Sequence, residues 1–95
     1  MEIEIRSFGQ AATASDEEFR RADERVQAEF YSLQAGFLRR TTARSPANEW
    51  IDIVLWHTDG DADRAGEAAA TSESVRAFLA TLDRVPVAQR YTTLD

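Results

Sequence analysis

The chain has 95 residues, enough for one folded domain, and its apolar and charged fractions are those of an ordinary globular protein. Its net charge of −6 argues against nucleic acid and anionic membrane surfaces as partners, because both bind positively charged faces. All eleven basic residues are Arg, so Schiff-base lysine chemistry is excluded, and the absence of Cys excludes disulfides, zinc–thiolate sites and iron–sulfur clusters.

Targeting and cofactor signals are also missing from the sequence. No basic-then-apolar leader opens it, and no apolar run approaches the length of a membrane span. No Walker, dinucleotide-binding or G-x-S-x-G motif occurs. We therefore expect a cytoplasmic protein that has no membrane partner and no cofactor.

The first half of the chain predicts a strand followed by a helix. Residues 2–8 (EIEIRSF) alternate between apolar and polar, which is typical of a strand with Ile3 and Ile5 on one covered face. Ser15 followed by Glu18 forms a capping-box signature. Apolar residues then recur at spacings of three and four, which predicts a helix to about Ser32.

The second half predicts a hairpin, a helical region and a last strand. Residues 37–43 (FLRRTTA) and 50–56 (WIDIVLW) are strand-like and are separated by a turn at 45–48. Residues 61–70 favour a helix, and Ser72 or Ser74 caps a further one. Residues 85–92 (VPVAQRYT) predict a strand. Pro86 indicates that this strand either lies at an edge of the sheet or begins at the proline.

These elements give the order β-α-β-β-α-β within one domain spanning residues 1–95, with a second helix that is either continuous or broken in two. The order is that of an α+β, ferredoxin-like domain with a four-stranded antiparallel sheet. Two helices can cover only one face of such a sheet.

The strand at 50–56 is apolar on both faces. Trp50, Val54 and Trp56 occupy one face, and isoleucine and leucine occupy the other. We expect the tryptophan face to be free of helices and to be covered by a second copy of the chain, because an exposed apolar patch of that size would associate with other molecules. The sequence thus predicts a homodimer built through the sheet faces, a dimeric α+β barrel.

Asp52 lies on the tryptophan face and is therefore expected at the contact with the partner. A buried carboxylate needs a partner, and Arg39 or Arg40 on the neighbouring strand can supply one. Two interpretations stay open: a structural ion pair that fixes the register, or a general acid or base with a shifted pKa.

Few other residues carry a chemical signal. His57, the only histidine, is either a loop residue without a role or a functional one, a proton acceptor at the mouth of a cavity or a ligand. Asp59, Asp61 and Asp63 have the spacing of a calcium loop, but the loop's required Gly and Glu are missing. We expect these acids to act as helix caps and solubilising charges, and we expect no metal site.

Aromatic and arginine side chains are the remaining candidates. Tyr31 and Trp56 belong either to the core or to the wall of a pocket. Four arginines lie on predicted strands, where some must point inward and could form an anion or phenolate subsite or simply pair with acids; they are Arg6, Arg39, Arg40 and Arg90.

The segments LQAGFLRRTT and EWIDIVLW resemble the small dimeric α+β barrel proteins, in particular the antibiotic-biosynthesis-monooxygenase-like group. The resemblance rests on the pair Gly36–Phe37 that opens the second strand, on Trp56 at the end of the third, and on the order of elements. It implies a dimer and an activity such as cofactor-free oxygenation of a phenol. The haem-degrading branch uses an Asn on the first strand and a Trp and a His in the second helical region, and this chain has none of them there.

Two functions follow from these residues and from the resemblance. The first is a monooxygenase-like oxidoreductase acting on a small aromatic or hydroxylated substrate, with His57 as base and Asp52 as a second catalytic candidate. Trp56 and Tyr31 would stack on the substrate, and Arg40 would stabilise a developing oxyanion. The second is a non-catalytic module that binds a small molecule or only dimerises. An enclosed pocket with convergent polar groups would favour the enzyme.

Overall fold

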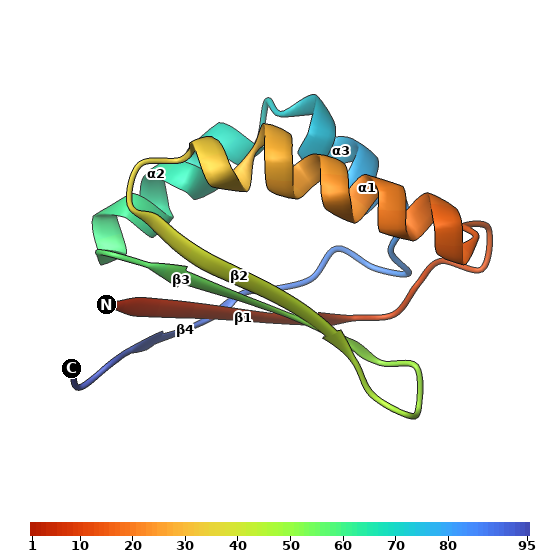
Figure 1. The fold of residues 1–95 in the computed structure, drawn as a ribbon, viewed down its shortest axis with the longest axis horizontal. Coiled ribbons are helices and arrows are strands. Elements are labelled where there is room, and N and C mark those ends of the chain that lie inside the picture. Colours follow the sequence, from red (N-terminus) through yellow and green to blue (C-terminus); the bar gives the residue numbers. More distant parts are fainter.

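The computed structural model describes residues 1–95 and places all helices on one side of a single sheet (Figure 1). The strands are β1 (Glu2–Phe8), β2 (Phe37–Arg44), β3 (Trp50–Trp56) and β4 (Gln89–Thr92). The helices are α1 (Asp16–Glu29), the 3-10 turn η1 (Tyr31–Leu33), α2 (Asp59–Ala69) and α3 (Glu73–Leu79). The predicted order of elements is confirmed, and the second helical region is divided into α2 and α3.

The sheet has the strand order β2-β3-β1-β4, and every neighbouring pair is antiparallel. This is the ferredoxin-like α+β arrangement that the sequence predicts. The last strand is shorter than expected and starts at Gln89, beyond Pro86, whose nitrogen has no hydrogen for a ladder bond.

Side-chain caps fix where the two longer helices begin. The Ser15 hydroxyl accepts from the Glu18 amide at 3.1 Å, and the Glu18 carboxylate accepts from the Ser15 amide at 3.3 Å. Thr58 and Asp61 form the same reciprocal box on α2, so this helix starts two residues before the predicted position. None of the helices is both long enough and apolar enough to span a membrane.

The tryptophan face of β3 lies beneath the helices, so the prediction that this face is free of helices is wrong. Val54 and Trp56 are 0% and 1% exposed, and the Trp50 ring lies 4.6 Å from the Phe19 ring of α1. The physical reason is that large aromatic side chains gain much from burial and from contact with one another, and here the Trp50 ring of β3 packs on the Phe19 ring of α1. The buried hydrophobic core consists of Phe8, Phe19, Val26, Phe30, Val54, Trp56, Ala62, Ala65, Phe78 and Leu82.

The polar residues of β1 also face the helices, which reverses the predicted orientation of this strand. Glu2 and Glu4 are 7% and 4% exposed, and Arg6 lies on the same face. Residues directly opposite each other in an antiparallel ladder share a face, and these three pair with the tryptophan-bearing side of β3. Ile3 and Ile5 therefore point away from the helices.

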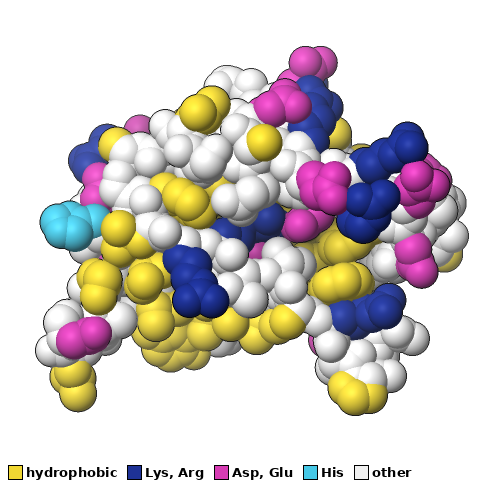
Figure 2. All heavy atoms as spheres, in the orientation of Figure 1, with side chains coloured by type: hydrophobic (Ala, Val, Ile, Leu, Met, Phe, Trp, Pro, Cys, Tyr) yellow, Lys and Arg dark blue, Asp and Glu magenta, His cyan; other side chains and the backbone are white.

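We call the side of the sheet away from the helices the open face. At its centre are five half-buried aliphatic side chains, Ile3, Ile5, Ile51, Ile53 and Leu55. Figure 2, in the orientation of Figure 1, shows hydrophobic side chains gathered along the underside of the sheet. The surface that lacks a cover is therefore the isoleucine face rather than the tryptophan face.

Candidate functional site

A row of polar side chains crosses the sheet beneath the helices. Arg6 of β1 lies opposite Asp52 of β3, which lies opposite Thr42 of β2. Arg40 and Glu4 flank this row on the same face. The sheet thus brings charged groups from three strands into the layer that otherwise forms the hydrophobic core.

Asp52 is fully buried, and only one of its carboxylate oxygens is occupied. Its Oδ1 lies 2.9 Å from Arg40 Nε and 3.2 Å from the Thr42 hydroxyl, while its Oδ2 has no hydrogen-bond partner. Burial raises the pKa of Asp52, and the positive charges of Arg40 and Arg6 oppose this rise. Asp52 is therefore a carboxylate with a free oxygen and an increased tendency to take up a proton.

Of the two arginines that the sequence offered as partners of Asp52, Arg40 forms the ion pair and Arg39 is exposed. The contact lies on the helix side of the sheet, so the expectation that Asp52 meets a partner chain is wrong. Arg40 also contacts Asp23 of α1 at 2.7 Å, and its guanidinium lies 4.9 Å from the centre of the Tyr31 ring. Its charge is thus already compensated by two carboxylates.

A cavity of about 380 Å³ lies beside Asp52, between the sheet and the helices. Its polar lining residues are Arg6, Tyr31 and Asp52, and its other walls are apolar. The Nη1 atom of Arg6 is buried without a hydrogen-bond partner, and burial raises the pKa of the Tyr31 hydroxyl. The remaining lining residues are Phe8, Val26, Gly66, Ala69, Ala70, Val75, Phe78, Leu79, Val85 and Pro86.

A narrow pocket of about 30 Å³ shares Arg6, Tyr31, Gly66 and Ala69 with the main cavity. Trp56 forms part of its wall, and the Trp56 indole nitrogen donates a 2.8 Å hydrogen bond to Glu4. The two hollows together present an apolar space whose polar groups are few. This is the arrangement expected of a small-molecule site.

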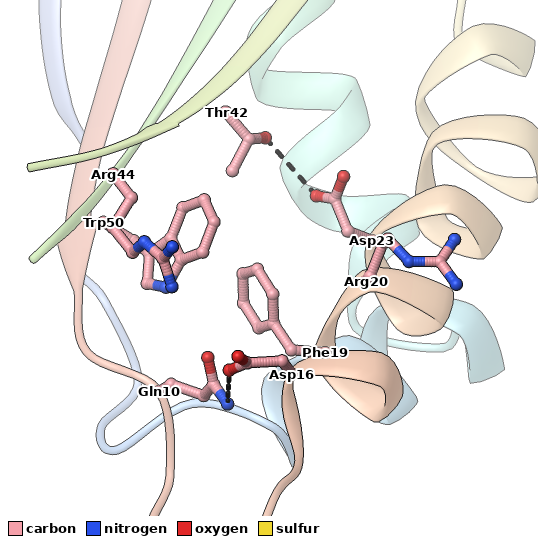
Figure 3. Close-up of a pocket in the computed structure, with 8 residues that line it drawn as sticks. All are labelled: Gln10, Asp16, Phe19, Arg20, Asp23, Thr42, Arg44 and Trp50. Atoms are coloured by element: carbon pink, nitrogen blue, oxygen red, sulfur yellow. Dashed lines mark hydrogen bonds between the residues drawn. The ribbon is translucent and has the colours of Figure 1, made fainter. Parts of the chain in front are cut away.

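A separate hollow of about 340 Å³ lies between the start of α1 and the β2–β3 hairpin (Figure 3). Its aromatic wall is formed by Phe19 and Trp50, and the Thr42 hydroxyl lies 3.3 Å from Asp23 across it. The polar groups that line it are hydrogen-bonded or exposed, and none is buried without a partner. The cavity beside Asp52 is therefore the better candidate for a functional site.

Four of the five predicted site residues come together in the structure. Arg40 contacts both Asp52 and Tyr31, and the Trp56 ring lies 6.4 Å from the Tyr31 ring. His57 is exposed at the end of β3 and lines none of the hollows, so no contact supports its expected role as a base.

Sequence reasoning did not single out Arg6, which it named only as one of four strand arginines. Arg6 lines both the cavity and the narrow pocket and keeps a buried nitrogen free. The signal that could have identified it is its place opposite Asp52 once the register of β1 and β3 is known.

The acids at the start of α2 have structural partners. Asp59 and Asp63 both lie 2.7 Å from Arg90 of β4, and Asp61 forms the helix cap. Arg90 also contacts Glu4 at 3.0 Å, which ties α2 to the centre of the sheet.

Comparison with known proteins gives similarities in structure only. No family model matches the sequence, and no curated protein matches it either. SnoaB, a cofactor-independent oxygenase from Streptomyces nogalater, has a similar structure with a TM-score of 0.81 at 21% identity, over 99% of this chain and 93% of that chain. A monooxygenase from the gene ActVA-Orf6 of Streptomyces coelicolor, solved in complex with Nanaomycin D, gives a TM-score of 0.71 at 17% identity, over 99% and 88%.

A further solved structure, described as an antibiotic biosynthesis monooxygenase, gives a TM-score of 0.70 at 13% identity and covers 100% of both chains. These similarities confirm the fold that the sequence resemblance implies, that of the antibiotic-biosynthesis-monooxygenase-like group.

Proposed function

We propose that the cavity beside Asp52 binds a small hydroxyaromatic molecule and removes its phenolic proton, as the first step of an oxygenation that uses no cofactor. The observation that carries this proposal is the unpartnered carboxylate oxygen of Asp52, buried at an apolar cavity that Arg6 and Tyr31 also line. Solved oxygenases with a similar fold support an oxygenase reaction. The fold alone does not define the activity, because one fold hosts many activities.

Each polar group has a role in this proposal. Asp52 accepts the phenolic proton on its free Oδ2, because Oδ1 is already held by Arg40 and Thr42. The free Nη1 of Arg6 stabilises the resulting phenolate. Arg40 fills this role less well because two carboxylates lie 2.7 and 2.9 Å from it, whereas Arg6 has one ion-pair contact, with Glu4 at 3.6 Å. The ring of Tyr31 contributes an aromatic wall.

The oxygenation itself needs only the phenolate and dioxygen. A ring carbon that shares the negative charge forms a bond to one oxygen atom, and the distal oxygen takes a proton to give a hydroperoxide. The hydroperoxide then loses water: the ring carbon gives up its hydrogen, the O–O bond breaks, and the oxygen that stays on the carbon becomes a second ring carbonyl. Phenol and dioxygen thus give a quinone and water, with dioxygen as the oxidant.

Oxygen consumption with a panel of mono- and polyhydroxylated aromatic compounds tests this function. The native protein should consume oxygen with at least one of them, and Asp52→Asn should reduce the rate about 100-fold or more, which is within the usual effect of a general base. Glu24→Gln, the same chemical change on the exposed side of α1, is the matched control and should keep the native rate.

His57→Ala distinguishes the two candidate bases. If it abolishes oxygen consumption while Asp52→Asn does not, the assignment of Asp52 is wrong and the sequence-based choice of His57 is right. If the native protein binds hydroxyaromatic compounds in a titration of its tryptophan fluorescence but consumes no oxygen with any of them, the alternative of a non-catalytic binding module replaces the oxygenase.

We also propose that two copies of the chain stack their open faces to form a homodimer. The side chains that β1, β3 and β4 present on this face are uncharged, with isoleucine and leucine at the centre and Tyr91 52% exposed beside them. A two-fold axis would pair this apolar surface with itself. Sedimentation equilibrium should give a dimer for the native chain and a monomer for Ile53→Glu, and a native monomer would refute the proposal.

A further inference from the structure

Gly66 is a glycine in the interior of α2 that local geometry does not require. Glycine weakens a helix interior relative to alanine, so its presence calls for a reason. One ordinary reason is a positive φ, but Gly36 is the only glycine that has one. The other is a close neighbour, but a Cβ built at Gly66 would meet no atom within 4 Å, whereas at Gly36 it would collide with Asp61.

Gly66 lies at the edge of the cavity. Gly66 lines both the main cavity and the narrow pocket, and it is exposed, so it lies where the cavity opens to solvent. Two neighbouring residues along the cavity are also small: Ala69, the last residue of α2, and Ala70, which follows it. The same cavity is lined by the fully buried Asp52 with its unpartnered oxygen, the group to which the proposed function assigns the ligand's hydroxyl.

We propose that Gly66 is a specificity-determining residue, because its missing side chain leaves the room at the cavity opening that a ligand larger than one ring occupies. A side chain at this position sets the upper limit on ligand size and leaves the polar end of the site unchanged. This role rests on the proposed function, since it presupposes that the cavity takes a hydroxyaromatic ligand.

Two probes and three variants test the role. The probes are 4-nitrophenol, with one ring, and 1,2-dihydroxyanthraquinone, with three fused rings. The variants are Gly66→Ala, Gly66→Leu and the matched control Ala68→Leu, which changes an exposed residue on the same helix that lines no hollow. Dissociation constants come from quenching of tryptophan fluorescence, and melting temperatures come from circular dichroism.

Gly66→Leu should weaken binding of the three-ring probe about tenfold or more, the effect of a few misplaced methyl groups in a pocket. It should change binding of 4-nitrophenol less than about twofold, and Ala68→Leu should leave both affinities within that same range. Gly66→Ala should raise the melting temperature by roughly 2–8 °C, because the helix gains propensity, and should weaken the three-ring probe by a smaller factor than leucine does.

The outcomes separate the two proposals. If the native protein binds both probes and the Gly66 variants bind the three-ring probe as tightly, the proposed site stands and the role of Gly66 is refuted. If the native protein binds neither probe, the proposed function falls and takes this role with it. If Gly66→Leu fails to fold, Gly66→Ala decides: an unchanged affinity for the three-ring probe refutes the role, and a loss of about threefold or more supports it.

Discussion

Replacing Arg40 with methionine should destabilise the protein far more than replacing Asp52 with asparagine, although the two residues form one ion pair. Arg40 has two carboxylate partners, Asp23 at 2.7 Å and Asp52 at 2.9 Å, so it keeps one when Asp52 is lost. Asp52 has Arg40 as its only ion-pair partner, so without it the buried carboxylate keeps one hydrogen bond, from the hydroxyl of Thr42, and the more distant charge of Arg6.

The magnitudes follow from this asymmetry. Leaving a buried charge without its ionic partner costs about 3–5 kcal/mol. Losing one contact while a second partner remains costs about 1–2 kcal/mol. Arg40→Met keeps the aliphatic stem and also loses the cation over the Tyr31 ring, which adds about 0.5–1 kcal/mol. A small domain has a total stability of about 5–15 kcal/mol, so Arg40→Met removes a large share of it and Asp52→Asn a minor one.

Urea unfolding measures both changes, provided that the slope of the transition stays constant. Arg21→Met, at a side chain that is 73% exposed and paired with Glu17, is the matched control and should cost about 0.5 kcal/mol or less. The penalty of Arg40→Met should shrink at lower pH, where the isolated Asp52 takes up a proton. A loss for Asp52→Asn that equals or exceeds that for Arg40→Met would refute the reasoning.

Three further predictions concern stability. Trp56→Phe removes the buried 2.8 Å hydrogen bond to Glu4 and should cost about 1–3 kcal/mol, measured by urea unfolding; a neutral effect would show that Glu4 is satisfied without the indole. Ser15→Ala breaks the capping box with Glu18 and should lower the unfolding free energy by about 1 kcal/mol, whereas Ser15→Asp should preserve it. Because the folded-state pKa of Asp52 is raised above 3.8, its stabilising contribution is complete below that pH and is lost as the pH rises through the folded-state pKa. The stability of the native chain relative to Asp52→Asn should therefore fall as the pH rises above 3.8, and a difference that grows with pH would contradict the raised pKa.

The sequence predicted the elements well because each has a local signal. The alternation in residues 2–8, the Ser15–Glu18 box and the two strand-like runs around the turn at 45–48 all correspond to elements of the structure. Local patterns also limited the partner of Asp52 to Arg39 or Arg40, because hairpin strands are neighbours whatever the rest of the sheet does, but only the structure identifies Arg40.

The orientation of the sheet was not predictable in the same way. Alternation shows that a strand has two different faces, but it does not show which face the helices will cover. In β3 both faces are apolar, and in β1 the glutamates are buried because Trp56, Thr92 and Arg90 supply their hydrogen bonds across the sheet. Those partners lie up to 90 residues away in the chain, so no local pattern reveals them.

The orientation error also displaced the candidate site. With the tryptophan face assigned to a partner chain, Arg6 had no reason to be singled out, and His57 was the nearest titratable group to Trp56. The structure instead gathers Arg6, Tyr31 and Asp52 at one cavity because they share the helix-covered side of the sheet.

The crystal structure of the protein with a bound hydroxyaromatic compound such as 1,2-dihydroxyanthraquinone tests the central claim most directly. We expect the ligand in the cavity between the sheet and α2, with a phenolic oxygen within hydrogen-bonding distance of Asp52 and of Arg6 Nη1. A ligand that leaves this cavity empty, or that occupies it with its hydroxyl groups turned away from Asp52, would contradict the account.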